Sequence, residues 1–140
     1  MPCVRGYNDF REAVARKLER ENGRLVDPEY EILPPIGCQQ VTDTTFRILV
    51  NQGDEVLLMD PEYASTEPAI RMAGGRVMPV PLSWDGAEWR FDFEALASRA
   101  SRHTQLLVLS HGGHPSGTAY SREQPGQTAG HAKHRDHGVL

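Results

Sequence analysis

The sequence predicts an α/β fold in three layers, with helices on both faces of a mainly parallel sheet. Two runs of consecutive apolar residues, 56–59 and 106–109, are typical of strands covered on both faces. Helix-like segments precede and separate these runs, and the connections between them are short. A strand, a helix and a second strand joined in this way form a right-handed crossover between parallel strands. At 140 residues the chain is long enough for one domain with a single core.

The first predicted helix follows Asn8, whose side chain is expected to cap it by accepting a backbone N–H. Phe10, Val14 and Leu18 recur at intervals of four and form one apolar stripe. Gly23 suits the left-handed position that ends a helix.

The segment 31–35 is predicted to be extended, and its two prolines allow at most a short edge strand. A second helix is predicted from Cys38 to Val50. Its inward-facing residues are expected to be Val41, Thr45, Ile48 and Leu49.

The rest of the predicted sheet follows a turn at 52–54. After the strand at 56–59, a helix is predicted over 64–73, and a strand over 76–82 whose prolines place it near an edge or make it short. A polar hairpin is expected at 84–89. Asp92 then caps a helix that leads to the strand at 106–109.

Residues 124–137 show no apolar periodicity, and Pro125, Gly126 and Gly130 interrupt any helix that Ser121 begins. We therefore predict a folded part at 1–123 and an irregular, histidine-rich tail at 124–140.

Composition excludes several classes of protein. The net charge of −4 gives no electrostatic reason to expect nucleic acid or an anionic membrane as a partner. No apolar run approaches the ~20 residues that span a bilayer, and the N-terminus lacks the apolar core of a signal peptide. Cys3 and Cys38 suggest no disulfide framework, so a cytoplasmic location is expected.

Three sites carry residues suited to ligand binding. Gly37 before a helix leaves the N–H groups of Cys38 and Gln39 pointing outward, an arrangement that binds phosphate, although many such junctions are simply turns. Tyr63 follows a strand at the edge where open α/β sheets bind ligands, and its ring can stack on a flat heterocycle or lie half-buried over a helix start. His114, in the loop 110–117, can donate a hydrogen bond or belong to a surface turn.

Five short motifs, in order and at matching spacing, resemble the class I/II aminotransferases of fold type I: Gly37, Gly53-Asp54-Glu55, Pro61-x-Tyr63, Ala73-Gly74-Gly75 and Pro115-x-Gly117. The resemblance covers about residues 5–123. It implies the large, cofactor-binding domain of an enzyme that uses pyridoxal phosphate to move an amino group between an amino acid and a 2-oxo acid, usually as a homodimer.

The same resemblance implies roles for individual residues. Cys38, Gln39 and Gln40 would take the cofactor phosphate, and Tyr63 would stack on the pyridine ring. His114 stands where the family has the asparagine that reaches the ring hydroxyl. Thr66 departs from the family, which often has a second aromatic residue there.

The chemistry of the family also needs a lysine in a Ser-x-x-Lys setting and an aspartate facing the pyridine nitrogen. The two lysines, Lys17 and Lys133, lie in neither setting. We therefore expect a partial-length fragment that is inactive alone. The composition of the tail separately suggests the hypothesis that it is out of frame.

Three alternatives stay open. The chain can be a non-catalytic subunit that assembles with a lysine-bearing polypeptide, or a carbon–sulfur lyase of the same fold. It can also be a metal-binding protein that uses the histidines of its tail, His131, His134 and His137, although a physiological metal site is not expected there.

Overall fold

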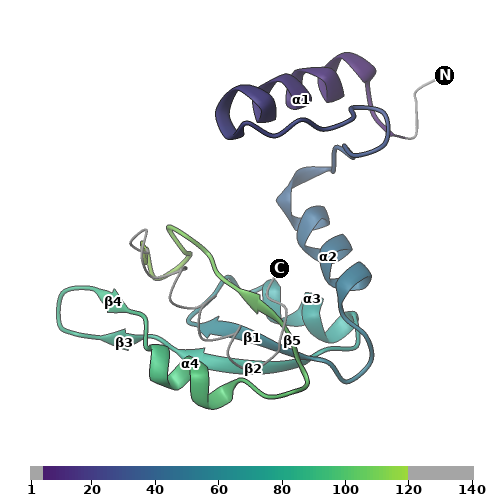
Figure 1. Ribbon diagram of the computed structural model, residues 1–140. Helices are drawn as coiled ribbons and strands as arrows, with labels where there is room; N and C mark the ends of the chain where they lie inside the picture. The colour runs from purple at the N-terminus through teal and green to yellow at the C-terminus, as the bar shows by residue number, and fades with distance from the viewer. Residues whose placement is uncertain (1–4, 120–140) are drawn as a thin grey trace. The chain divides into compact units, whose positions relative to one another are not determined.

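The computed structural model describes residues 5–119, and the chain divides into two compact units, Met1–Val41 and Thr42–Leu140 (Figure 1). The predicted tail at 124–140, its boundary at 123 and the helix start at Ser121 lie outside the described residues.

The first unit contains helix α1 (Asn8–Asn22). The prediction that Asn8 caps this helix is wrong, because Tyr7 is the capping residue and makes no side-chain cap. Asn8 lies inside the first turn, where its side chain donates to Glu12 (2.6 Å). Gly23 does end the helix in the left-handed conformation, with φ of 64°, as predicted.

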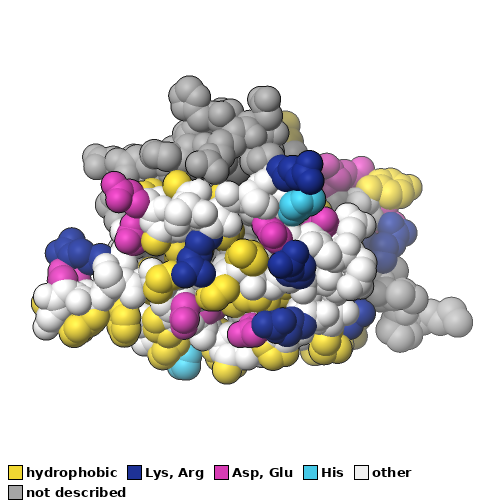
Figure 2. All heavy atoms as spheres, turned by 90° about the horizontal axis from the view of Figure 1, so that it is seen from below, with side chains coloured by type: hydrophobic (Ala, Val, Ile, Leu, Met, Phe, Trp, Pro, Cys, Tyr) yellow, Lys and Arg dark blue, Asp and Glu magenta, His cyan; other side chains and the backbone are white. Residues whose placement is uncertain are grey.

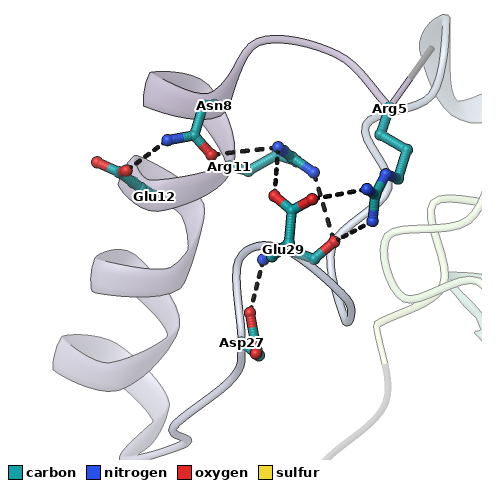
Figure 3. Close-up of polar contacts among 6 residues, drawn as sticks. All are labelled: Arg5, Asn8, Arg11, Glu12, Asp27 and Glu29. Carbon is teal, nitrogen blue, oxygen red and sulfur yellow. Dashed lines mark hydrogen bonds and ion pairs between the residues drawn. The ribbon is translucent and has the colours of Figure 1, made fainter. Parts of the chain in front are cut away.

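An ion-pair cluster fastens the extended segment after α1 to the helix (Figure 3). Arg11 is only 2% exposed, and its Nη2 donates to Glu29 Oε2 (3.0 Å) and Asn8 Oδ1 (3.1 Å). Arg5 approaches the same Glu29 carboxylate at 2.6 Å. Arg11 is the buried residue of α1, whereas Val14 and Leu18 of the predicted apolar stripe are half-buried and Phe10 is 56% exposed.

Helix α2 (Gly37–Leu49) begins in the first unit and ends in the second. Its predicted inward face is wrong. Val41, Thr45 and Ile48 are exposed, whereas Phe46 and Val50 are buried. Phe46 and Val50 are one helical turn apart, so they form the stripe that packs into the core.

The second unit is built on a parallel sheet, as predicted, and the structure gives its strand order as β2-β1-β5. Strand β1 (Glu55–Asp60) is central and pairs with β2 (Arg76–Pro81) and β5 (Thr104–Val108). Residues 55–59 are buried, which agrees with a strand covered on both faces. β2 lies at an edge of this sheet. Prolines are tolerated there because an edge strand pairs on one side only, so the backbone N–H that proline lacks need not be a hydrogen-bond donor of the sheet.

Helices cover both faces of the sheet and complete the predicted three layers (Figure 1). Alternate residues of β1 point to opposite faces. Val56 and Leu58 pack with α2 and α3 (Thr66–Met72) in one core cluster. Leu57 and Met59 pack in a second cluster with Leu96 of α4 (Phe93–Arg99).

A two-stranded hairpin of β3 (Ser83–Trp84) and β4 (Trp89–Arg90) follows β2, as predicted. In its turn, the Asp85 carboxylate accepts the N–H of Glu88, and with the Arg90 guanidinium and the N–H of Ala87 this lowers the pKa of Asp85 to about 2. Asp92 then caps α4 by accepting the N–H of Ala95 (2.9 Å), again as predicted.

Charged side chains of both signs are interspersed with apolar ones on the face of the molecule shown in Figure 2. None of the helices between residues 5 and 119 combines the length and apolar character needed to cross a membrane.

Candidate functional site

The predicted ligand-binding residues fall into two groups, one in each unit. Cys38 and Gln39 belong to the first unit, and Tyr63 and His114 to the second. Each group is built by a strand end or a helix start, the places where backbone donors and exposed side chains face outward.

The first group lies in the first turn of α2. Gly37 opens the helix with φ of 74°, a left-handed conformation that glycine adopts without strain. Cys38 and Gln39 are exposed, and the first turn contains no acidic residue. The side chain of Gln40, in the first turn, accepts the N–H of Ile36 (2.5 Å), the residue just before the helix. The first turn of α2 therefore supplies no carboxylate of its own to neutralise the positive end of the helix dipole.

Tyr63 lies just beyond the carboxyl end of β1. Its carbonyl accepts the N–H of Thr66 (2.9 Å), which ties its backbone to the start of α3. Its side chain is 50% exposed. The backbone is thus fixed by the fold, while the ring stays open to a ligand.

The loop after β5 closes on itself. The N–H groups of Gly112 and Gly113 both point to Thr118 O, at 2.8 and 3.3 Å, and Gly117 N donates to Gly113 O. A Cβ on Gly113 would lie 2.9 Å from Ser110 O, so only glycine fits this fold of the loop. Thr118 is buried. The loop is therefore a compact body that carries His114 on its exposed side.

The structure brings Tyr63 and His114 together. Their ring centroids are 5.5 Å apart and the planes are at 79°, an edge-to-face contact. The contact arises because β1 and β5 are adjacent parallel strands, whose carboxyl ends lie at the same edge of the sheet. Sequence analysis selects both residues separately, and the sheet order pairs them.

Two residues at this edge have no counterpart in the sequence analysis. The Ser110 hydroxyl lies 2.8 Å from both carboxylate oxygens of Glu62. In the sequence, Glu62 and Ser110 could be singled out by their location alone, because each is a polar residue next to the end of a predicted strand. Their pairing spans 48 residues and needs the sheet order to become visible.

A pocket of about 480 Å³ lies beside the end of this loop, between residues 116–119 and the β3–β4 hairpin. Aromatic side chains from the hairpin line its other side, namely Trp84, Trp89 and Phe91. The pocket thus lies between the hairpin and the far end of the loop that carries His114.

The chemical groups found at these two places are of the types that bind pyridoxal phosphate. An exposed phenol ring and an imidazole side by side match a flat heterocycle with a hydroxyl group, and a helix start without acidic residues matches a phosphate. Lys17 lies on α1 with its ammonium group 3.6 Å from Glu21, and Lys133 lies outside the described residues.

Metal ligands do not gather in the described part of the chain. Between residues 5 and 119, no three His, Cys, Asp or Glu side chains are grouped so that they could hold an ion. The three histidines of the predicted tail lie outside this range.

Comparison with known proteins points to one family. The family model for aminotransferase class I and II matches residues 1–139. A probable N-succinyldiaminopimelate aminotransferase of Mycobacterium tuberculosis is 34% identical over 116 residues, which are 83% of this chain and 29% of that protein. The human kynurenine–oxoglutarate transaminase 3 is 29% identical over 85% of this chain and 28% of its own length.

Solved structures give the same result. N-succinyldiaminopimelate aminotransferase from Mycobacterium tuberculosis superposes with a TM-score of 0.87 and 31% identity, over 99% of this chain and 36% of that one. The chain thus spans about a third of the length of its relatives. These relatives are aminotransferases, and they do not favour a carbon–sulfur lyase or a non-catalytic subunit. The chain belongs to the aminotransferase class I and II family.

Proposed function

We propose that this chain supplies the cofactor-binding part of an aminotransferase that moves an amino group between an amino acid and a 2-oxo acid. Pyridoxal phosphate is the cofactor of the family. The observation that carries the proposal is the contact between Tyr63 and His114 at the carboxyl edge of the sheet. By the resemblance, both residues stand at positions that contact the cofactor ring, with His114 in place of the family's asparagine.

Each group has one task in this proposal. The N–H groups of Cys38 and Gln39 bind the phosphate, helped by the helix dipole. The ring of Tyr63 lies against the pyridine ring, and His114 donates a hydrogen bond to the ring hydroxyl. The bound cofactor supplies an electron sink for the substrate's amino-bearing carbon.

The 140-residue polypeptide alone is expected to be inactive. Neither of its two lysines follows the Ser-x-x-Lys pattern, and the side chain of Lys17 is 63% exposed and paired with Glu21. A lysine with these surroundings is not set up for the proton transfers of transamination.

Binding and activity can be tested separately. Pyridoxine 5′-phosphate has the ring and phosphate of the cofactor but no aldehyde, so its binding by calorimetry needs no lysine. We expect the full chain to bind it, and Tyr63→Ala to weaken binding about threefold to tenfold through the lost ring contact. Tyr30→Ala is the matched control, since Tyr30 is 80% exposed in the first unit. Equal affinities in the two variants would contradict the proposed role of Tyr63.

Activity is tested by adding pyridoxal phosphate, an amino acid and 2-oxoglutarate to the purified chain, with an active transaminase as positive control. We expect no product. Sustained turnover by the chain alone would overturn the expectation that it is inactive.

We also propose that this chain assembles as a homodimer in the cytoplasm. Support comes from the first unit, where seven large apolar side chains are exposed: Tyr7, Phe10, Leu25, Tyr30, Leu33, Ile36 and Val41. Light scattering after gel filtration should give twice the 15.6 kDa of one chain. A mass of one chain at all concentrations would refute the dimer.

A further inference from the structure

The carboxylate of Glu62 joins the ends of two neighbouring strands. Ser110 Oγ lies 2.8 Å from Oε1 and 2.8 Å from Oε2 of Glu62, so its single proton points between the two oxygens. Glu62 follows β1 and Ser110 follows β5, which are adjacent in the sheet. The bond therefore crosses the same edge on which the two rings of the candidate site lie.

The same carboxylate also holds the backbone beside one of these rings. Tyr63 N donates to Glu62 Oε1 at 2.8 Å. Glu62 thus contacts the residue that carries the phenol ring and, through Ser110, the first residue of the loop that carries the imidazole. Hydrogen bonds to an ionised acceptor are about twice as strong as those between neutral groups.

The loop itself transmits this contact to His114. Backbone hydrogen bonds close the loop between Gly112 and Thr118, so it behaves as one body. The orientation of such a hydrogen-bonded loop is set where it leaves the sheet, and Ser110 lies at that point, just after β5. A change at Ser110 is therefore expected to turn the whole loop, including the imidazole, relative to Tyr63.

We propose that Glu62 and Ser110 are positioning residues that set the His114 ring against the Tyr63 ring. This inference rests on the proposed function. If the chain binds the cofactor as proposed, the pair determines how tightly it holds the cofactor ring. Neither residue has to touch the cofactor for this role.

The test uses the full chain and the NMR signals of the His114 ring protons. An aromatic ring 5.5 Å away shifts these signals by its ring current, and Tyr63→Leu gives their position without that ring. We expect Ser110→Ala to move the His114 signals toward the Tyr63→Leu position, and Ser110→Thr, which keeps a hydroxyl, to restore them. Ser98→Ala is the matched control, because the Ser98 hydroxyl donates to the carbonyl of Ala95 in its own helix.

A second variant helps to distinguish a change in ring position from a loss of folding. Glu62→Gln keeps the length of the side chain and one acceptor oxygen but removes the charge, so its His114 signals should lie between those of the native chain and Ser110→Ala. Unchanged melting temperatures together with shifted ring signals distinguish positioning from general destabilisation.

Binding of pyridoxine 5′-phosphate gives an independent readout. The loss of one hydrogen bond of this kind at a part-exposed site predicts about fivefold weaker binding in Ser110→Ala, and recovery in Ser110→Thr. If Ser110→Ala and Glu62→Gln leave the His114 signals in place, the positioning role is refuted. If the native chain binds no probe while the ring signals still move, the proposed function fails and the positioning role stands.

Discussion

Truncation of Ile70 to alanine should be among the most destabilising single changes in the second unit. Ile70 is fully buried on α3 and packs with Phe46, Val50, Val56 and Leu58. The change removes about three methyl or methylene groups, worth about 2.4 kcal/mol of transfer free energy at ~0.8 kcal/mol each. The cavity left behind adds to this, so we expect the free energy of unfolding to fall by about 3–4 kcal/mol.

A neighbouring glycine makes the prediction sharper. A Cβ on Gly75 would lie 2.9 Å from Ile70 Cγ2 and 2.9 Å from Val50 Cγ1, so Gly75→Ala alone forces these side chains to move. In the Ile70→Ala background the first of these contacts is gone. The double variant should therefore lose less stability than the sum of the two single variants.

Urea unfolding of the full chain, followed by far-ultraviolet circular dichroism, measures all three variants. Met72→Ala is the control, because Met72 is on the same helix but 68% exposed, and it should change stability by no more than about 0.5 kcal/mol. If Ile70→Ala costs no more than Met72→Ala, the described packing of α3 is wrong. Strict additivity of Ile70→Ala and Gly75→Ala would refute the contact between them.

Three further predictions concern polar groups of the second unit. Because the pKa of Asp85 is lowered to about 2, its carboxylate stabilises the hairpin at pH values above its ordinary pKa, and this contribution should be lost as the pH falls toward 2. NMR titration of the carboxyl carbon measures this, and a midpoint near 4 would contradict it. Ser101→Ala should cost about 1–2 kcal/mol in urea unfolding, because it removes a hydrogen-bond donor from the buried Glu55 carboxylate; no loss would show that water replaces the hydroxyl. Asp92→Ala should cost about 1 kcal/mol by removing the cap on the N–H of Ala95, whereas Asp92→Asn should cost much less, and equal losses would argue against capping.

The sheet and its layers could be predicted from the sequence because local patterns determine them. A continuous apolar run marks β1, prolines place β2 at an edge, and Asp92 marks the start of α4. In each case the residues that reveal the element in the sequence are also those that produce it. The causes are burial on both faces for β1, the missing N–H of proline for β2 and the side-chain cap for α4.

Choices between equivalent local patterns could not be predicted. Helix α2 has apolar residues on more than one side, and only its packing in the core shows that Phe46 and Val50 face inward while Ile48 faces out. At the start of α1, the Asn8 side chain bonds to Glu12 and Arg11 and so does not cap the helix.

The candidate site shows the same limit. Tyr63 and His114 could be selected from motifs, and their role in binding a cofactor stays a prediction. The bond between Glu62 and Ser110 could not be selected, because nothing local in the sequence relates residues 48 positions apart.

Strand β1 has a consequence for how the sequence can change in length. Its residues alternate between the two core clusters, so one inserted residue would exchange every later side chain of the strand between layers. An insertion in the turn between β3 and β4 would disturb neither cluster, because residues 85–88 are exposed. Length differences among natural versions of this protein should therefore gather in the hairpin, while β1 keeps a constant number of residues.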